Sequence, residues 1–213
     1  MTLFKILLAI HIFCGGTSLL LGFFILLSRK GNRRHKFAGT IYFYSMLLTA
    51  LLAVVLAYLH PNYFLFIIGI FTSYMLLTGK SYLRKRSQFD VKHIDWLLSL
   101  TMLLFGAVLI ALGCYNMILG NNFGVVHLVF GGFSCLFVYQ DYINFKGRSS
   151  VQNYWLVTHL QRMVGSYIAS VTAFIVVNNT FLPGYIAWLL PTVLLVPLII
   201  ILSRKHENNP NFQ

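Results

Sequence analysis

Two histidines open nearly identical stretches in distant parts of the chain. His11 begins HIFCGGTSLL and His127 begins HLVFGGFSCL, which share the His, a Gly-Gly pair, a Ser and a Leu at matching positions. Gly15 and Ser18 follow His11 at i+4 and i+7, and the second stretch repeats this spacing, so each set lines one face of a helix. A neutral imidazole is a common metal ligand and an axial ligand of haem iron. The duplication therefore predicts that the two histidines converge on one bound group.

A second group of reactive side chains is expected at the opposite ends of the predicted helices from His11 and His127. It comprises His35 in RRHKFAG, Asp141 in VYQDYINF, and His159 with Arg162 in VTHLQRM. At 1.5 Å and 100° per residue, Asp141 lies about 21 Å along a helix from His127 and some 40° around it, so both face the same way. Arg162 follows His159 by three residues and shares its face. These residues could bind a cofactor, or Asp141 and Arg162 could neutralise each other within the protein.

The composition places these side chains in a lipid bilayer. Hydrophobic residues make up 58% of the 213 residues, the mean hydropathy is +0.77, and 9% are charged, against roughly 25% in an average soluble domain. A spanning helix needs about 20 mostly apolar residues. The chain is therefore predicted to form one all-α integral membrane domain over residues 1–213, with seven spans at Leu3–Leu27, Phe37–Leu59, Tyr63–Leu77, Ile94–Leu119, Phe123–Phe145, Tyr154–Val177 and Leu182–Leu202.

The basic residues predict how these spans are oriented. Fourteen of the 16 Lys and Arg residues fall on one side, in the connections after the first, third and fifth spans and after the last span. Only Lys5 falls on the other side, and Arg162 lies inside a span. Because Lys and Arg in short loops stay in the cytoplasm, the amino terminus is expected outside and the carboxyl terminus inside. The net charge of +12 is then explained by topology and by contact with anionic lipids of the cytoplasmic leaflet, not by nucleic acid.

The doubled stretch also predicts a parallel internal repeat. The first and fifth spans carry the two copies, and the second and sixth share a Gly followed by a hydroxyl residue, Gly39-Thr40 and Gly165-Ser166. We expect two three-helix units, residues 3–83 and 123–203, joined by a linking helix at residues 94–119 and related by an approximate two-fold axis along the membrane normal. The first, second, fifth and sixth spans should then form the core. Close helix packing is the alternative explanation for the repeated small residues.

The sequence resembles a family of bacterial predicted membrane proteins, domain of unknown function 2306. The resemblance lies in HIFCGGTSLLLGF in the first span, RRHKFAGTIY at the start of the second, and HLQRMVGSYIASVTAFIVVN in the sixth. Lys36 and Thr40 stand where the family more often has arginine. The resemblance implies a multi-pass protein of the bacterial cytoplasmic membrane. It assigns no chemistry, because the family has no assigned function.

Two histidine pairs, each drawn from two helices, favour a dihaem b-type cytochrome that carries electrons across the membrane. His11 and His127 would bind an outer haem, and His35 and His159 an inner one. Glycines one turn from the ligands would leave room for the macrocycle. The propionates of the inner haem would meet three arginines, Arg33, Arg34 and Arg162.

Two other functions use the same residues differently. His35, Asp141 and His159 form a two-His, one-carboxylate set that could bind Zn or non-haem Fe in an intramembrane hydrolase. That reading explains Asp141 but not the outer histidines. In a transporter or an assembly subunit, the His, Asp and Arg residues would relay protons or pair with one another.

Overall fold

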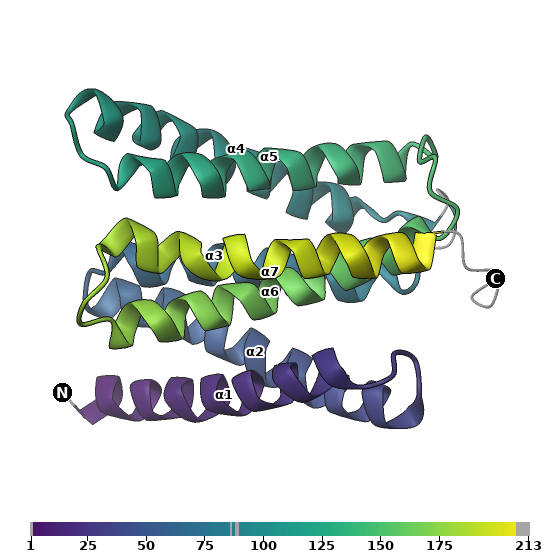
Figure 1. Ribbon diagram of the computed structural model, residues 1–213, viewed down its shortest axis with the longest axis horizontal. Coiled ribbons are helices and arrows are strands. Elements are labelled where there is room, and N and C mark those ends of the chain that lie inside the picture. Colours follow the sequence, from purple (N-terminus) through teal and green to yellow (C-terminus); the bar gives the residue numbers. More distant parts are fainter. Residues whose placement is uncertain (1, 86, 88–89, 208–213) are drawn as a thin grey trace.

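Seven α-helices make up the computed structural model, which describes residues 2–85, 87 and 90–207 (Figure 1). Within those residues the helices are α1 (Thr2–Leu27), α2 (Arg33–Leu59), α3 (Tyr63–Tyr82), α4 (His93–Ile118), α5 (Gly124–Phe145), α6 (Tyr154–Asn178) and α7 (Gly184–Glu207), and there is no strand. Each is long and apolar enough to cross a membrane. The predicted all-helical, seven-span fold is confirmed, and the third helix continues past the apolar run to Tyr82.

The starts of α2 and α3 follow from asparagines that cap their first turns. Asn32 accepts a hydrogen bond from the backbone N–H of His35 at 2.7 Å, and Asn62 accepts one from Leu65 at 3.2 Å. Side chains of this kind satisfy the free N–H groups of a first helical turn. Gly31 and Gly147 have φ angles of 81° and 65° in the connections after α1 and α5, where residues with a Cβ would be strained.

The connections after α1, α3 and α5 lie at the same end of the bundle as the end of α7 (Figure 1). These connections and the adjoining helix ends carry the described Lys and Arg residues that the sequence assigned to the cytoplasm. Arg86 lies outside the described residues. We call this end the basic end. Which side of a membrane it faces stays a prediction.

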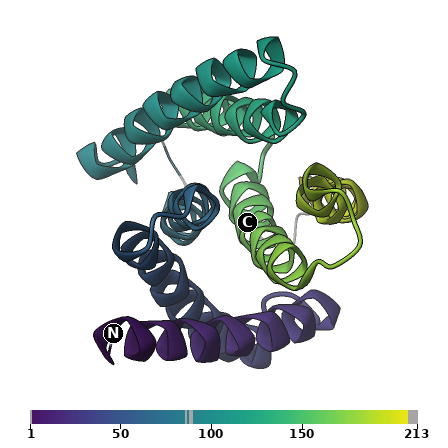
Figure 2. The ribbon, with the colours of Figure 1, turned by 90° about the vertical axis from the view of Figure 1, so that its left-hand side faces the viewer.

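The central helices are α3 and α6, so of the four spans predicted to form the core the sixth is central, while the third was not predicted to be. α3 packs against α2 and α6 and touches α4, whereas α1 lies at the edge of the bundle against α2 (Figure 2). Small residues permit these approaches. A Cβ on Gly69 would lie 2.8 Å from the Ala50 carbonyl oxygen, and one on Gly79 would lie 2.8 Å from the Arg162 Cβ.

The second copy of the doubled stretch packs α5 against α4. A Cβ on Gly131 would lie 2.7 Å from Ile110 Cγ1, and one on Gly106 would lie 2.7 Å from the Ser134 Cβ. The first copy instead turns toward α2, where Ser18 and Ser45 share a hydrogen bond of 2.9 Å. α1 therefore pairs with the helix that follows it and α5 with the helix that precedes it. This pairing does not follow the predicted two-fold arrangement. Close packing accounts for Gly131 and Ser134 of the second copy, whereas a Cβ on Gly16 or on Gly132 would meet nothing within 4 Å.

Candidate functional site

The outer histidines lie in separate parts of the bundle. His11 bonds through Nδ1 to the carbonyl oxygen of Thr49 in α2, at 3.0 Å. His127 bonds through Nδ1 to the Phe123 carbonyl oxygen of its own helix, at 3.2 Å, and its ring stands edge-on to the Phe123 ring. Their helices, α1 and α5, do not pack against each other and lie on opposite sides of the bundle (Figure 2). The prediction that these two imidazoles converge on one group is wrong, because each helix buries its small-residue face against a different neighbour.

Asp141 and Arg162 form a fully buried ion pair. Arg162 Nη2 lies 3.0 Å from Asp141 Oδ1, and both side chains are 0% exposed. Arg162 Nη2 also donates to the Phe137 carbonyl oxygen at 2.9 Å, and its guanidinium lies 3.9 Å from the centre of the Phe137 ring. Of the two explanations that the sequence allowed for these residues, the structure shows mutual neutralisation.

Three hydroxyl groups complete the environment of the carboxylate. Tyr82 donates to Oδ1 at 2.8 Å, Ser99 donates to Oδ2 at 2.8 Å, and Tyr74 donates to Oδ2 as well. With Arg162, these donors come from α3, α4 and α6 and meet on a residue of α5. A buried charge is tolerated when its partners satisfy it in this way. The network therefore joins four helices toward the basic end.

The sequence did not reveal the hydroxyl partners. Tyr74 and Tyr82 are eight residues apart in α3, a spacing that puts them within about 80° on one helical face at 100° per residue. That spacing was a detectable signal, but it was masked by the many aromatic residues of the chain. Ser99 carries no such signal, because a single serine in a span is ordinary.

The predicted zinc or iron site of His35, Asp141 and His159 is not assembled. Both oxygens of Asp141 are engaged by the donors described above. Within the described part of the chain, no group of three His, Cys, Asp or Glu side chains is placed to hold a metal ion. The hydrolase hypothesis needs the Asp141 carboxylate as a metal ligand, but this carboxylate forms an ion pair with Arg162.

His35 and His159, by contrast, line one pocket between α1, α2, α3 and α6 toward the basic end. Its volume is about 490 Å³. His159 bonds through Nδ1 to the Gly79 carbonyl oxygen at 2.8 Å, while Nδ1 of His35 is buried without a hydrogen-bond partner. A Cβ on Gly39, one turn after His35, would meet nothing within 4 Å. Apolar side chains form the body of the pocket: Ile25, Leu26, Tyr42, Phe43, Leu156, Leu160, Met163, Val164 and Tyr167.

Three lysines border this pocket, which we call the histidine pocket. Lys30 donates to the carbonyl oxygen of Leu26 at 2.8 Å, and Lys80 lies 3.9 Å from the centre of the Phe43 ring. Burial lowers the pKa of Lys30. Lys36 is the third, and the described lining includes no acidic residue. Arg162, expected to meet the propionates of an inner haem, instead lies on Asp141, and Arg33 and Arg34 are exposed and outside the lining.

The family described as predicted membrane protein (DUF2306) matches residues 8–127, more than half of the chain. The protein belongs to the DUF2306 family. The matched segment runs from α1 to the start of α5 and contains His11, His35 and His127. His159, in a stretch that resembles the same family by sequence, lies beyond it. No curated protein and no solved structure matches this DUF2306 chain.

Proposed function

We propose that this multi-pass membrane protein is a b-type cytochrome that binds a single haem in the histidine pocket, with His35 and His159 as axial ligands. The observation that carries the proposal is the convergence of two imidazoles from α2 and α6 on one apolar pocket. The dihaem hypothesis is thereby reduced to its inner site, because His11 and His127 are engaged separately.

The ring nitrogens suit axial ligation. The N–H of His159 Nδ1 is directed to the Gly79 carbonyl oxygen, which fixes the neutral tautomer and leaves the Nε2 lone pair free. Such a hydrogen bond also holds the ring in one orientation. Nδ1 of His35 is a buried polar atom without a partner, which costs free energy unless something binds there.

Shape and charge support the same ligand. The volume of about 490 Å³ falls within the roughly 300–1,000 Å³ typical of small-molecule sites. The open space at Gly39 gives a flat macrocycle room beside the His35 ligand. Lys30, Lys36 and Lys80 supply positive charge for two propionates, and no described acidic side chain in the lining would repel them.

Bound haem would give the protein a centre that accepts and releases one electron at a time. The residues of this chain would hold it, fix its axial ligands and keep bulk water away. Burial and axial ligand identity are the means by which a protein sets the potential of such a centre.

The test compares four histidine variants of the protein purified from haem-replete cells. His35→Leu and His159→Leu should lose the intense Soret absorption, whereas His11→Leu and His127→Leu should keep it. Imidazole added to a His35→Gly variant should restore the spectrum, which separates loss of a ligand from loss of folding. Equal spectra for all four leucine variants, or a wild-type protein that neither contains haem nor binds added haemin, would overturn the proposal.

A further inference from the structure

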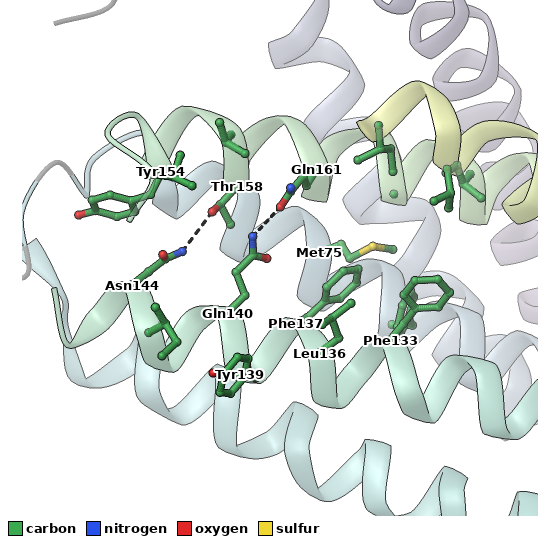
Figure 3. A pocket seen from close by; sticks show the side chains of 18 of the residues that line it. Met75, Phe133, Leu136, Phe137, Tyr139, Gln140, Asn144, Tyr154, Thr158 and Gln161 are labelled. Atoms are coloured by element: carbon green, nitrogen blue, oxygen red, sulfur yellow. Dashed lines mark hydrogen bonds between the residues drawn. The ribbon is translucent and has the colours of Figure 1, made fainter. Parts of the chain in front are cut away.

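A second cavity, of about 500 Å³, separates α5 from α6. These helices are consecutive in the chain, yet their backbones hardly touch. They are instead bridged by side chains: Gln140 donates to Gln161 at 2.6 Å, and Asn144 donates to Thr158 at 3.2 Å (Figure 3). α7 forms the far wall and α3 the floor. We call this cavity the α5–α6 groove.

The polarity of the α5–α6 groove changes along its length. At the basic end it is lined by Arg148, Ser149 and Ser150 of the connection after α5, and by Tyr154 at the start of α6. Next come the bridging amides and Thr158. Farther from the basic end the lining is mostly apolar, with two threonines, Thr172 and Thr192. The apolar residues are Phe71, Val129, Phe130, Phe133, Ile168 and Ala169. α5 lines the groove from Val129 to Asn144, about 22 Å at 1.5 Å per residue.

We infer that the α5–α6 groove binds an anionic phospholipid, whose phosphate meets Arg148 and whose acyl chain lies along the apolar wall. A glycerophospholipid has the same order of chemistry: a charged head, polar ester groups, and a hydrocarbon tail. Arg148 is the only charged side chain among the described lining residues. A phosphate there would gain a charged partner and meet no carboxylate.

The bound lipid would also hold the α4–α5 hairpin to the rest of the bundle. Direct contacts between that hairpin and α6–α7 include the Asp141 network, the two side-chain bridges, and the edge-on contacts of Phe123 and Phe130 with Trp188, at 5.6 and 5.4 Å between ring centres. Their backbones pack against each other at few places. A lipid between the two would add apolar contact on both sides of the gap. The inference is independent of haem, since the histidine pocket lies on the other face of α6.

The test uses native mass spectrometry. Delipidated protein is incubated with equal amounts of phosphatidylglycerol and phosphatidylcholine, and the bound molecules of each lipid are counted. Both lipids carry a phosphate, but only phosphatidylglycerol has a net negative charge, because the choline ammonium neutralises phosphatidylcholine. One basic residue that faces an anionic head group predicts about fivefold preference for phosphatidylglycerol. Arg148→Gln should abolish most of that preference. Arg204→Gln, an exposed arginine at the same end but outside the groove, should not.

A second pair of variants tests the acyl site. Thr192→Phe should fill the groove and reduce retention of both lipids, while Val193→Phe, on the exposed face of α7, should leave retention unchanged. If Thr192→Phe does not fold, Ile199→Phe fills the same wall. Equal effects of Arg148→Gln and Arg204→Gln would show attraction to the basic surface only and overturn the inference, as would full retention in the filled variants. Haem content should not change in any of these variants.

Discussion

Replacing Asp141 by leucine should destabilise the helix bundle severely, since it leaves a fully buried guanidinium without its carboxylate. Breaking a buried ion pair by removing one partner costs about 3–5 kcal/mol, because the remaining charge is uncompensated. Here Arg162 would keep only the Phe137 carbonyl oxygen as a hydrogen-bond acceptor, and the hydroxyls of Tyr74, Tyr82 and Ser99 would lose theirs. We therefore expect a loss near the upper part of that range.

The double variant Asp141→Leu/Arg162→Leu separates the pair from its surroundings. It removes both charges, so its cost should fall below the sum of the two single variants by about 2 kcal/mol, within the range of roughly 0.5–3 kcal/mol for residues in direct contact. Unfolding in mixed micelles, titrated with a denaturing detergent and followed by tryptophan fluorescence, measures the three free energies. Tyr139→Leu, on the exposed side of α5, is the matched control. Additive costs, or single losses under about 1 kcal/mol, would refute the reasoning.

Three further substitutions test the packing and the remaining polar contacts. Gly131→Leu should separate α5 from α4, because the new side chain collides with Ile110, and it should lower the unfolding free energy by at least about 2 kcal/mol. Gly132→Leu is the control: a Cβ there meets nothing within 4 Å, so it should cost little in the same detergent titration. His11→Leu should lower the unfolding free energy by about 1 kcal/mol, the usual value of one intramembrane hydrogen bond, because it removes the bond to Thr49. A decrease of more than about 3 kcal/mol would show a role that this hydrogen bond does not explain. Lys85 Nζ lies 2.8 Å from Asp95 Oδ1, and both side chains are nearly inaccessible, so Lys85→Met should lower the unfolding free energy, measured by thermal unfolding, by about 3 kcal/mol. Lys92→Met, at an exposed position, should be close to neutral in the same thermal unfolding measurement.

The sequence predicted the helices well because each depends on local information. Apolar run length decides whether a segment spans a membrane. It does not include the polar first turn that Asn32 caps, and so α2 begins at Arg33, before the predicted Phe37. The placement of basic residues likewise follows from their position between spans. The pairing of Asp141 with Arg162 was one of two explanations available from helix faces alone, since each charge needs a partner within the bundle.

The neighbours of each helix could not be predicted in this way. A stripe of small residues shows which face of a helix is packed, but not against which helix. The stripes after His11 and His127 are alike in sequence, yet one faces α2 and the other α4. The central place of α3 was missed for a related reason. Its small residues, Gly69 and Gly79, let α2 and α6 approach α3 closely. The length of an apolar run does not predict which helices a span contacts.

The proposed site combines a residue pair that the sequence suggested with contacts that only the fold supplies. His35 and His159 were paired from their place near the same ends of two spans. Lys30 and Lys80 were not foreseen there, because they reach the histidine pocket from outside the helices that carry the histidines. Arg162 was assigned to this pocket but turns toward Asp141, since a buried carboxylate offers it a stronger partner.

Haem stoichiometry of the wild-type protein tests the central claim most directly. A pyridine haemochrome assay on the purified chain, combined with electron paramagnetic resonance of the oxidised form, gives the number of haems and their axial ligands. The account predicts one b-type haem per chain with a low-spin, bis-imidazole signal. Two haems per chain would contradict the separation of His11 from His127, and a chain without haem would contradict the histidine pocket as a cofactor site.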